Sequence, residues 1–190
     1  MGINRETLNF LEETIRENKI GLLRMVELGN QFMKGMNIET GRIAKDYFIS
    51  KGFDHTSIDK NGKDGALPIS LNKEIFNTTL IKSFDILTNF GTTEHVTNQY
   101  ICWKNIHNLV KQNGLFVHLV PLIKNWKGHG YYKYTTDFFY KLSKECNYEI
   151  LKHFIRKDLP GKDMICCSMI KLQDNVFVPE ENFFKPIEEG

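Results

Sequence analysis

The sequence predicts an α/β domain with a doubly wound, seven-stranded sheet that is mostly parallel, ends in an antiparallel hairpin and carries helices on both faces. Two observations support this fold class. Apolar segments of strand length alternate along the chain with amphipathic segments of helix length. The last two predicted strands are joined only by a turn at Pro160-Gly161, which is too short for a crossover helix and therefore requires an antiparallel pair.

The expected strands share an apolar centre and a polar or glycine-containing boundary. They cover residues 22–28, 53–59, 66–71, 83–89, 115–120, 148–154 and 164–172. The expected helices show apolar residues at helical spacing, as Leu8, Leu11 and Ile15 do in the first. They cover residues 4–18, 38–51, 98–112 and 135–145, with Gly114 as the C-terminal stop of the third; residues 73–82 are a helix or a loop.

Length and composition indicate one globular domain over residues 1–190, with a flanking helix at 4–18 and a short tail at 175–190. Hydrophobic residues make up 41% of the chain and charged residues 25%. No run of eighteen apolar residues and no signal-peptide pattern occurs, so we expect a cytoplasmic protein that does not bind membranes. The net charge of +2 is too small to indicate nucleic-acid binding. The oligomeric state, monomer or homodimer, stays open.

The four cysteines lie at positions 102, 146, 166 and 167. None has the spacing of a metal-binding pair such as C-x-x-C, so we expect reduced, buried thiols and no metal site.

The segment over residues 25–35, MVELGNQFMKG, is the first candidate for a ligand site. It leaves a buried strand through an acid, Glu27, and a glycine, Gly29. Glycine lets the backbone approach a ligand closely, and a carboxylate at a strand end accepts hydrogen bonds from hydroxyl or amino groups. Turns of this kind are where nucleotide-like cofactors bind in α/β folds.

Two further segments carry a resemblance to a known family. Residues 84–96, FDILTNFGTTEHV, look like the segment that follows the fourth strand in small-molecule methyltransferases, and residues 57–67, SIDKNGKDGAL, look like the strand-two acid and its loop. Together with the acid-and-glycine turn, they make the whole chain resemble a class I S-adenosylmethionine-dependent methyltransferase. The resemblance implies a Rossmann-like fold, S-adenosylmethionine as cofactor and a small-molecule substrate.

The resemblance also implies which residues bind the cofactor. An acceptor-only carboxylate suits the two ribose hydroxyls, and Asp59 is the expected residue. The expected cofactor-binding residues are Glu27, Gly29, Asn30, Asp59, Lys60, Phe90 and Gly91. Ser70 stands where the family often carries an acid that reaches the adenine amino group, so a hydroxyl or the backbone would serve there.

Methyl transfer from a sulfonium requires alignment of the acceptor and, for a hydroxyl, removal of its proton. Histidine is the natural base, and two histidines follow predicted strands at the expected ligand edge: His95 and His129. A structural role in capping the next helix is the alternative for His95. Aromatic residues surround His129, and we expect them to wall a substrate pocket: Trp126, Tyr131, Tyr132 and Tyr134.

Three functions compete. The first is methylation of an oxygen on a small polar metabolite, such as a sugar or sugar nucleotide. The second is a catalytically inactive methyltransferase-like binding or assembly module, favoured by residues 30–34, which separate Gly29 from Gly35 where the family carries closely spaced glycines. The third, a nicotinamide-dependent dehydrogenase, is disfavoured because G-x-G-x-x-G is absent.

Overall fold

The computed structural model describes residues 2–20, 24–35, 43–157 and 159–188, and its main sheet has the strand order β2-β1-β3-β4-β7-β6. Strands β2, β1, β3 and β4 are parallel, whereas β7 runs antiparallel to both β4 and β6. The predicted mostly parallel α/β sheet with a C-terminal antiparallel hairpin is confirmed. The strand bounds are β1 Arg24–Leu28, β2 Asp54–Ile58, β3 Phe84–Phe90, β4 Val110–Pro121, β6 Tyr148–Arg156 and β7 Met164–Lys171.

The sheet has six strands in the described part of the chain, so the predicted count of seven is wrong. Residues 66–71 were the expected extra strand, but they make one parallel bridge, between Leu67 and Ile58. Leu67 bonds to β2 through its N–H to Ser57 and its carbonyl to Asp59. Pro68 follows, and the N–H of Ile69, which would make the next bond to β2, donates instead to the Leu67 carbonyl at 2.8 Å, so the ladder ends there.

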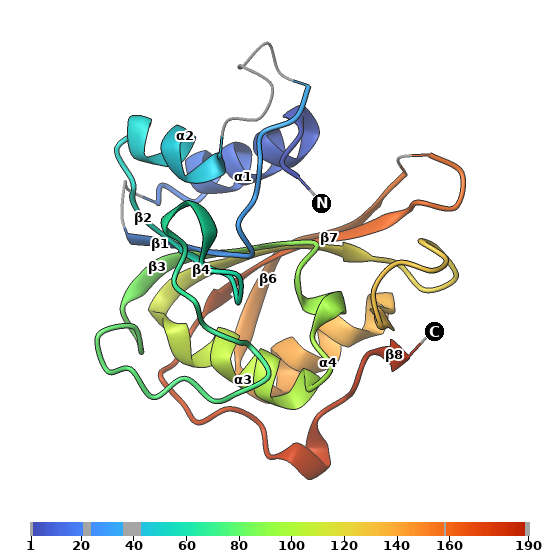
Figure 1. Cartoon of the computed structure of the whole chain (residues 1–190). Helices are drawn as coiled ribbons and strands as arrows, with labels where there is room; N and C mark the ends of the chain where they lie inside the picture. The colour runs from blue at the N-terminus through green and yellow to red at the C-terminus, as the bar shows by residue number, and fades with distance from the viewer. Residues whose placement is uncertain (1, 21–23, 36–42, 158, 189–190) are drawn as a thin grey trace.

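Helices cover both faces of the sheet, as predicted (Figure 1). Helices α1 (Arg5–Glu17) and α2 (Ala44–Ser50) lie on one face, and α3 (Gln99–Leu109) and α4 (Thr136–Cys146) lie on the other. Because neighbouring strand residues point to opposite faces, the sheet separates two apolar cores. Met25 belongs to the core under α1 and α2, and Val26 to the core over α3 and α4.

The helix N-termini follow the sequence closely. Asn4 caps α1 by accepting the N–H of Thr7, and Asn98 caps α3 by accepting that of Ile101. The predicted strand over residues 22–28 and helix over residues 38–51 fall partly on residues 22–23 and 38–42, which lie outside the described part. Residues 73–82 form turns rather than a helix.

Helix α3 ends earlier, and β4 begins earlier, than the sequence predicts. Val110 already pairs with Phe84, and a bulge follows before Leu115 pairs with Ile86. The helix already ends at Leu109, so Gly114 does not stop it as expected. Gly114 lies in this bulge, where a Cβ atom would approach the Lys111 carbonyl oxygen to 2.9 Å.

A buried lysine stabilises the junction between α3 and β4. Lys171 is fully buried, and its Nζ donates to the carbonyl oxygens of His107 and Val110, both at 3.0 Å. Asp174 Oδ1 lies 3.5 Å from the same nitrogen. The ammonium thus satisfies carbonyl groups that the end of a helix leaves without partners.

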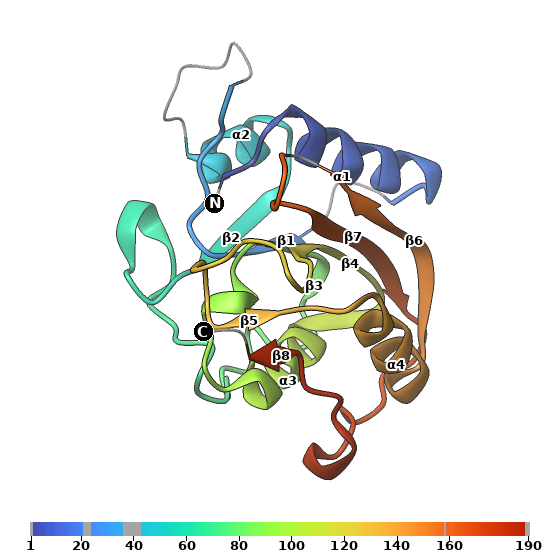
Figure 2. The same cartoon turned by 90° about the vertical axis from the view of Figure 1, so that its right-hand side faces the viewer.

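A second, small sheet lies beside α3 and α4 (Figure 2). It pairs β5 (Tyr132–Lys133) with β8 (Ile187–Glu188) in antiparallel fashion. No helix in the described residues is long and apolar enough to cross a membrane.

We expect Lys171→Met to lower the free energy of unfolding by about 1–3 kcal/mol, because two buried carbonyl groups lose their donor while the side-chain volume is kept. Urea denaturation measures the change. Lys144→Met, at an exposed position of α4, is the matched control and should change stability by less than about 0.5 kcal/mol. Equal losses in the two variants would contradict the capping role of Lys171.

Candidate functional site

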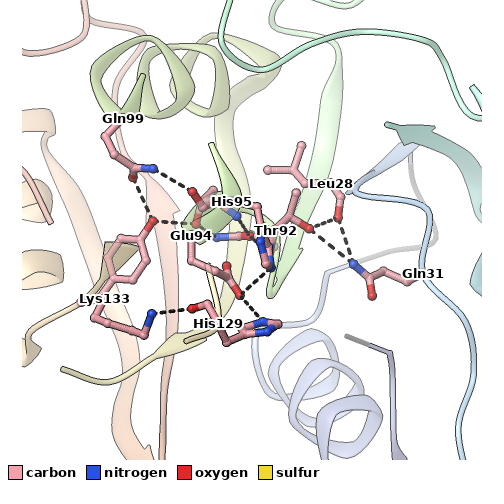
Figure 3. A network of polar contacts seen from close by, with 11 residues as sticks. Leu28, Gln31, Thr92, Glu94, His95, Gln99, His129 and Lys133 are labelled. Atoms are coloured by element: carbon pink, nitrogen blue, oxygen red, sulfur yellow. Dashed lines mark hydrogen bonds and ion pairs between the residues drawn. The ribbon is translucent and has the colours of Figure 1, made fainter. Parts of the chain in front are cut away.

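Leu28 and Gln31 of the loop after β1 contact Thr92 of the loop after β3 (Figure 3). Between them the chain turns at Gly29, which also lies against Thr92. Gly29 has a φ of +80°, and a Cβ atom there would lie 2.7 Å from Thr92 Oγ1. Thr92 Oγ1 donates to the Leu28 carbonyl at 2.7 Å, and the Gly29 N–H donates to the Ile58 carbonyl at 2.8 Å. The turn therefore excludes any side chain and joins the ends of β1, β2 and β3.

Glu27 lies beneath this turn and is fully buried. Its Oε1 accepts the N–H of Gln31 at 3.2 Å, and its Oε2 lies 3.9 Å from His55 Nε2. Burial raises the pKa of Glu27 to about 8 and lowers the pKa of His55 to about 4. Both shifts favour the neutral form of the side chain, so burial disfavours an ion pair between Glu27 and His55. Glu27 supports the turn through Gln31.

Asp59 holds the loop after β2 against the glycine turn. Its carboxylate accepts the N–H groups of Asn30 and Asn61, both at 3.0 Å. The Asn30 side chain donates to Asp64 Oδ2 at 2.6 Å. The acid at the end of β2 and the residue after the glycine are therefore in direct contact.

The loop after β3 is fixed from behind by a buried polar network. Thr93 Oγ1 accepts from the Asn89 side chain at 3.0 Å and from the Tyr134 hydroxyl at 2.8 Å. Gln99 Nε2 donates to the Thr93 carbonyl at 2.7 Å. The backbone around Glu94 and His95 is consequently held in one position relative to α3.

These three loops enclose a cavity of about 290 Å³ at the carboxyl ends of β1, β2 and β3. This is the edge where open α/β sheets bind ligands. Its volume is close to the lower end of small-molecule sites, roughly 300–1,000 Å³. Residues from all three loops line it: Gly29, Asn30, Gln31, Ile58, Asp59, Lys60, Ile69, Ser70, Leu71, Asn72, Gly91, Thr92, His95 and Val96.

The structure brings most of the predicted cofactor residues to this cavity. Those on its wall are Gly29, Asn30, Asp59, Lys60 and Gly91. Glu27 and Phe90 are buried in the protein and are not among the lining residues. Sequence reasoning missed Thr92 and Asn72; the available signal for Thr92 was its place directly after Gly91 at a strand end.

The two predicted catalytic histidines meet at one buried carboxylate (Figure 3). Their ring centroids lie 4.7 Å apart. Glu94 Oε1 lies 3.9 Å from His95 Nε2 and 3.8 Å from His129 Nε2. His95 lines the cavity, whereas His129 is not among the lining residues. Burial raises the pKa of Glu94 to about 7, lowers that of His95 to about 4 and lowers that of His129.

The four aromatic residues expected around the substrate do not line the cavity. Tyr134 is fully buried, and its hydroxyl donates to Thr93 in the network behind the site. Tyr132 donates its hydroxyl to the Thr97 carbonyl at 3.1 Å, and Tyr131 is exposed. Trp126 contacts His129, with ring centroids 5.3 Å apart.

No family model and no curated protein sequence matches this chain. Solved structures match it in fold. One is the Burkholderia thailandensis 1,6-didemethyltoxoflavin-N1-methyltransferase with bound 1,6-didemethyltoxoflavin and S-adenosylhomocysteine, with a TM-score of 0.62 and 12% identity over 86% of this chain and 77% of that one.

The N-methyltransferase NodS from Bradyrhizobium japonicum, in complex with S-adenosylhomocysteine, gives a TM-score of 0.60 and 12% identity over 90% of this chain and 89% of that one. An S-adenosylmethionine-dependent methyltransferase from Clostridium acetobutylicum gives a TM-score of 0.51 and 13% identity over 85% and 89%. The chain therefore has the Rossmann-like fold of these methyltransferases, as the sequence resemblance implied.

We expect Glu27→Gln to stabilise the protein increasingly as pH rises. The unfolded Glu27 carboxyl ionises near its ordinary value of 4.5, but the folded one near 8, so the native protein loses stability across that interval by up to roughly 5 kcal/mol. Gln cannot ionise and avoids this loss. Urea denaturation at pH 5, 7 and 9 measures the difference. The exposed Glu145→Gln is the control; a Glu27→Gln effect that stays constant with pH would contradict the buried, protonated carboxyl.

We expect Gly29→Ala to cost about 2–4 kcal/mol of stability, because left-handed backbone strain of about 1–2 kcal/mol adds to the contact with Thr92. Gly35→Ala isolates the strain alone, since Gly35 has a φ of +65° but no atom within 4 Å of a Cβ. Thermal or urea denaturation compares the two. Equal losses of stability in the two variants would show that the contact with Thr92 adds nothing to the cost of the left-handed backbone.

Proposed function

We propose that this protein is an S-adenosylmethionine-dependent methyltransferase that binds its cofactor in the cavity at the ends of β1, β2 and β3. The observation that carries the proposal is the meeting of Gly29, Asp59 and Gly91 on one cavity wall. These residues come from three separate loops, and the sequence resemblance assigned all of them to the same cofactor. The bound S-adenosylhomocysteine of two structures with this fold supports the choice.

The chemistry of the wall suits each part of the cofactor. In the proposal, Asp59 accepts hydrogen bonds from the ribose hydroxyls, because a carboxylate at a strand end has oxygens for both. The Gly29 turn and Asn30 contact the methionine part, where a side chain at position 29 would obstruct the approach. Lys60 flanks the same site. The apolar side chains of Ile58, Ile69 and Leu71 offer a surface for the adenine ring.

Glu27 and Phe90 support the cofactor site indirectly in this proposal. Glu27 acts through the N–H of Gln31, which lines the cavity. Phe90 ends β3 and places Gly91, whose N–H donates to the Leu119 carbonyl at 2.9 Å. Both residues therefore shape the wall without contacting the ligand.

We further propose that the acceptor is a small polar metabolite that reaches the sulfonium from the side of His95 and His129. His95 is the only one of the two on the cavity wall, and His129 contacts its ring. A sugar or sugar nucleotide methylated on oxygen fits a site with imidazole bases. The B. thailandensis and B. japonicum structures are N-methyltransferases, so an amine acceptor is the competing choice. Trp126 and Tyr131, beside His129, would flank the acceptor.

Calorimetric titration with S-adenosylhomocysteine tests the cofactor site. We expect one site per chain with a micromolar dissociation constant, and Asp59→Ala should weaken it at least tenfold, since a pair of charge-assisted hydrogen bonds contributes about 1.5 kcal/mol or more. Asp64→Ala is the matched control, because Asp64 also bonds to Asn30 but is not on the cavity wall. Absence of binding at millimolar ligand would favour the alternative, an inactive methyltransferase-like binding module.

A further inference from the structure

The cluster of Glu94, His95 and His129 has an unusual feature for a buried carboxylate. Glu94 is fully buried, yet neither carboxylate oxygen has a hydrogen-bond donor among the described residues. The two imidazoles that face it are 3.8 and 3.9 Å away, beyond hydrogen-bond distance. His129 Nε2 is also buried without a hydrogen-bond partner. A buried carboxylate whose two oxygens both lack a hydrogen-bond donor requires a cation or a donor to offset the cost of its burial.

The nearest buried ammonium group does not fill this position. Lys133 is buried beside the cluster, but its Nζ donates to the backbone carbonyl of His129 (Figure 3). Lys133 therefore fixes the loop that carries the histidine. The carboxylate faces the two ring nitrogens, and one ligand atom from each of the three residues falls within 4.8 Å of the others.

The backbone holds the three side chains together before any ligand binds. The Tyr131 N–H donates to the Glu94 carbonyl at 2.7 Å, and the His129 N–H donates to the Trp126 carbonyl at 3.0 Å. Gly130 has a φ of +70°, and a Cβ atom there would lie 2.9 Å from Glu94 Cγ. The loop after β4 is thus pressed against Glu94, which the Thr93 network supports from the opposite side.

We propose that Glu94, His95 and His129 form a binding site for one divalent transition-metal ion of the zinc or iron(II) class. Two imidazole nitrogens and one carboxylate oxygen are the donors these ions prefer, whereas Ca²⁺ and Mg²⁺ prefer oxygen alone. Tetrahedral ligands about 2.0–2.1 Å from zinc are about 3.3 Å apart. The carboxylate oxygen therefore needs to approach each imidazole nitrogen by about 0.5 Å, and the separation of up to 4.8 Å within the cluster has to shorten by up to about 1.5 Å.

The location gives the metal a role beside the proposed cofactor site. His95 lies both in the cluster and on the cavity wall, so the ion would lie at the cavity's edge. Three protein ligands leave coordination positions open, as in catalytic rather than structural metal sites. An oxygen or nitrogen of the acceptor would occupy one of them. The metal would then orient the acceptor and favour loss of its proton, a task otherwise given to the histidines.

Titration of chelator-treated, tag-free protein with Zn²⁺ by calorimetry, and with Co²⁺ by visible absorption, tests the site. We expect one ion per chain with a dissociation constant of about 1 µM or less. Glu94→Gln and His129→Ala should each weaken binding at least a hundredfold. His153→Ala, which removes a histidine on β6 outside the cluster, should bind the metal as the unaltered chain does. Circular dichroism checks that each variant is folded.

Lack of one-to-one binding in the unaltered chain, or equal affinity in Glu94→Gln and the unaltered chain, would overturn the metal site. S-adenosylhomocysteine binding is measured on the same metal-free sample, so the two proposals are judged separately. Metal binding without cofactor binding would support the metal site and contradict the methyltransferase function. Cofactor binding without metal binding would support the methyltransferase function and contradict the metal site.

Discussion

The contact between Gly29 and Thr92 is the constraint on which the candidate site depends. It joins the loop after β1 to the loop after β3 at a distance that leaves no room for a side chain. The Thr92 hydroxyl bonds to the last carbonyl of β1, and the Gly29 N–H bonds to the last carbonyl of β2. Three strand ends are therefore fixed to one another by two hydrogen bonds. This junction determines the shape of the cavity wall.

Features that depend on neighbouring residues were predictable from the sequence. Gly29 and Asp59 follow directly from strands, and the sequence placed both on the ligand edge because strand ends of a parallel sheet share that edge. The six strands that formed also matched their apolar patterns closely. The expected seventh makes only one bridge, because the N–H of Ile69 donates back to the Leu67 carbonyl instead of to β2.

Features that depend on packing between distant segments were not predictable. The sequence marked His95 and His129 separately, but their meeting at Glu94 depends on the lateral pairing of β3 with β4 and on the close approach of Gly130. Tyr134 was expected at the substrate, and its aromatic neighbours gave no sign that its hydroxyl bonds to Thr93 inside the core. A tyrosine in a loop and a tyrosine in a core look alike in sequence when both adjoin polar residues.

Pro68 has a consequence at the outer side of β2. An exposed sheet edge offers unpaired N–H and carbonyl groups to any extended chain that meets it, which is a common start of aggregation. The segment carrying Pro68 covers β2 but cannot extend the ladder itself. At the opposite edge, β6 presents Lys152 and Arg156, which pair with acids of α1. Proline at the β2 edge and charged side chains at the β6 edge thus both disfavour pairing with a strand of another molecule.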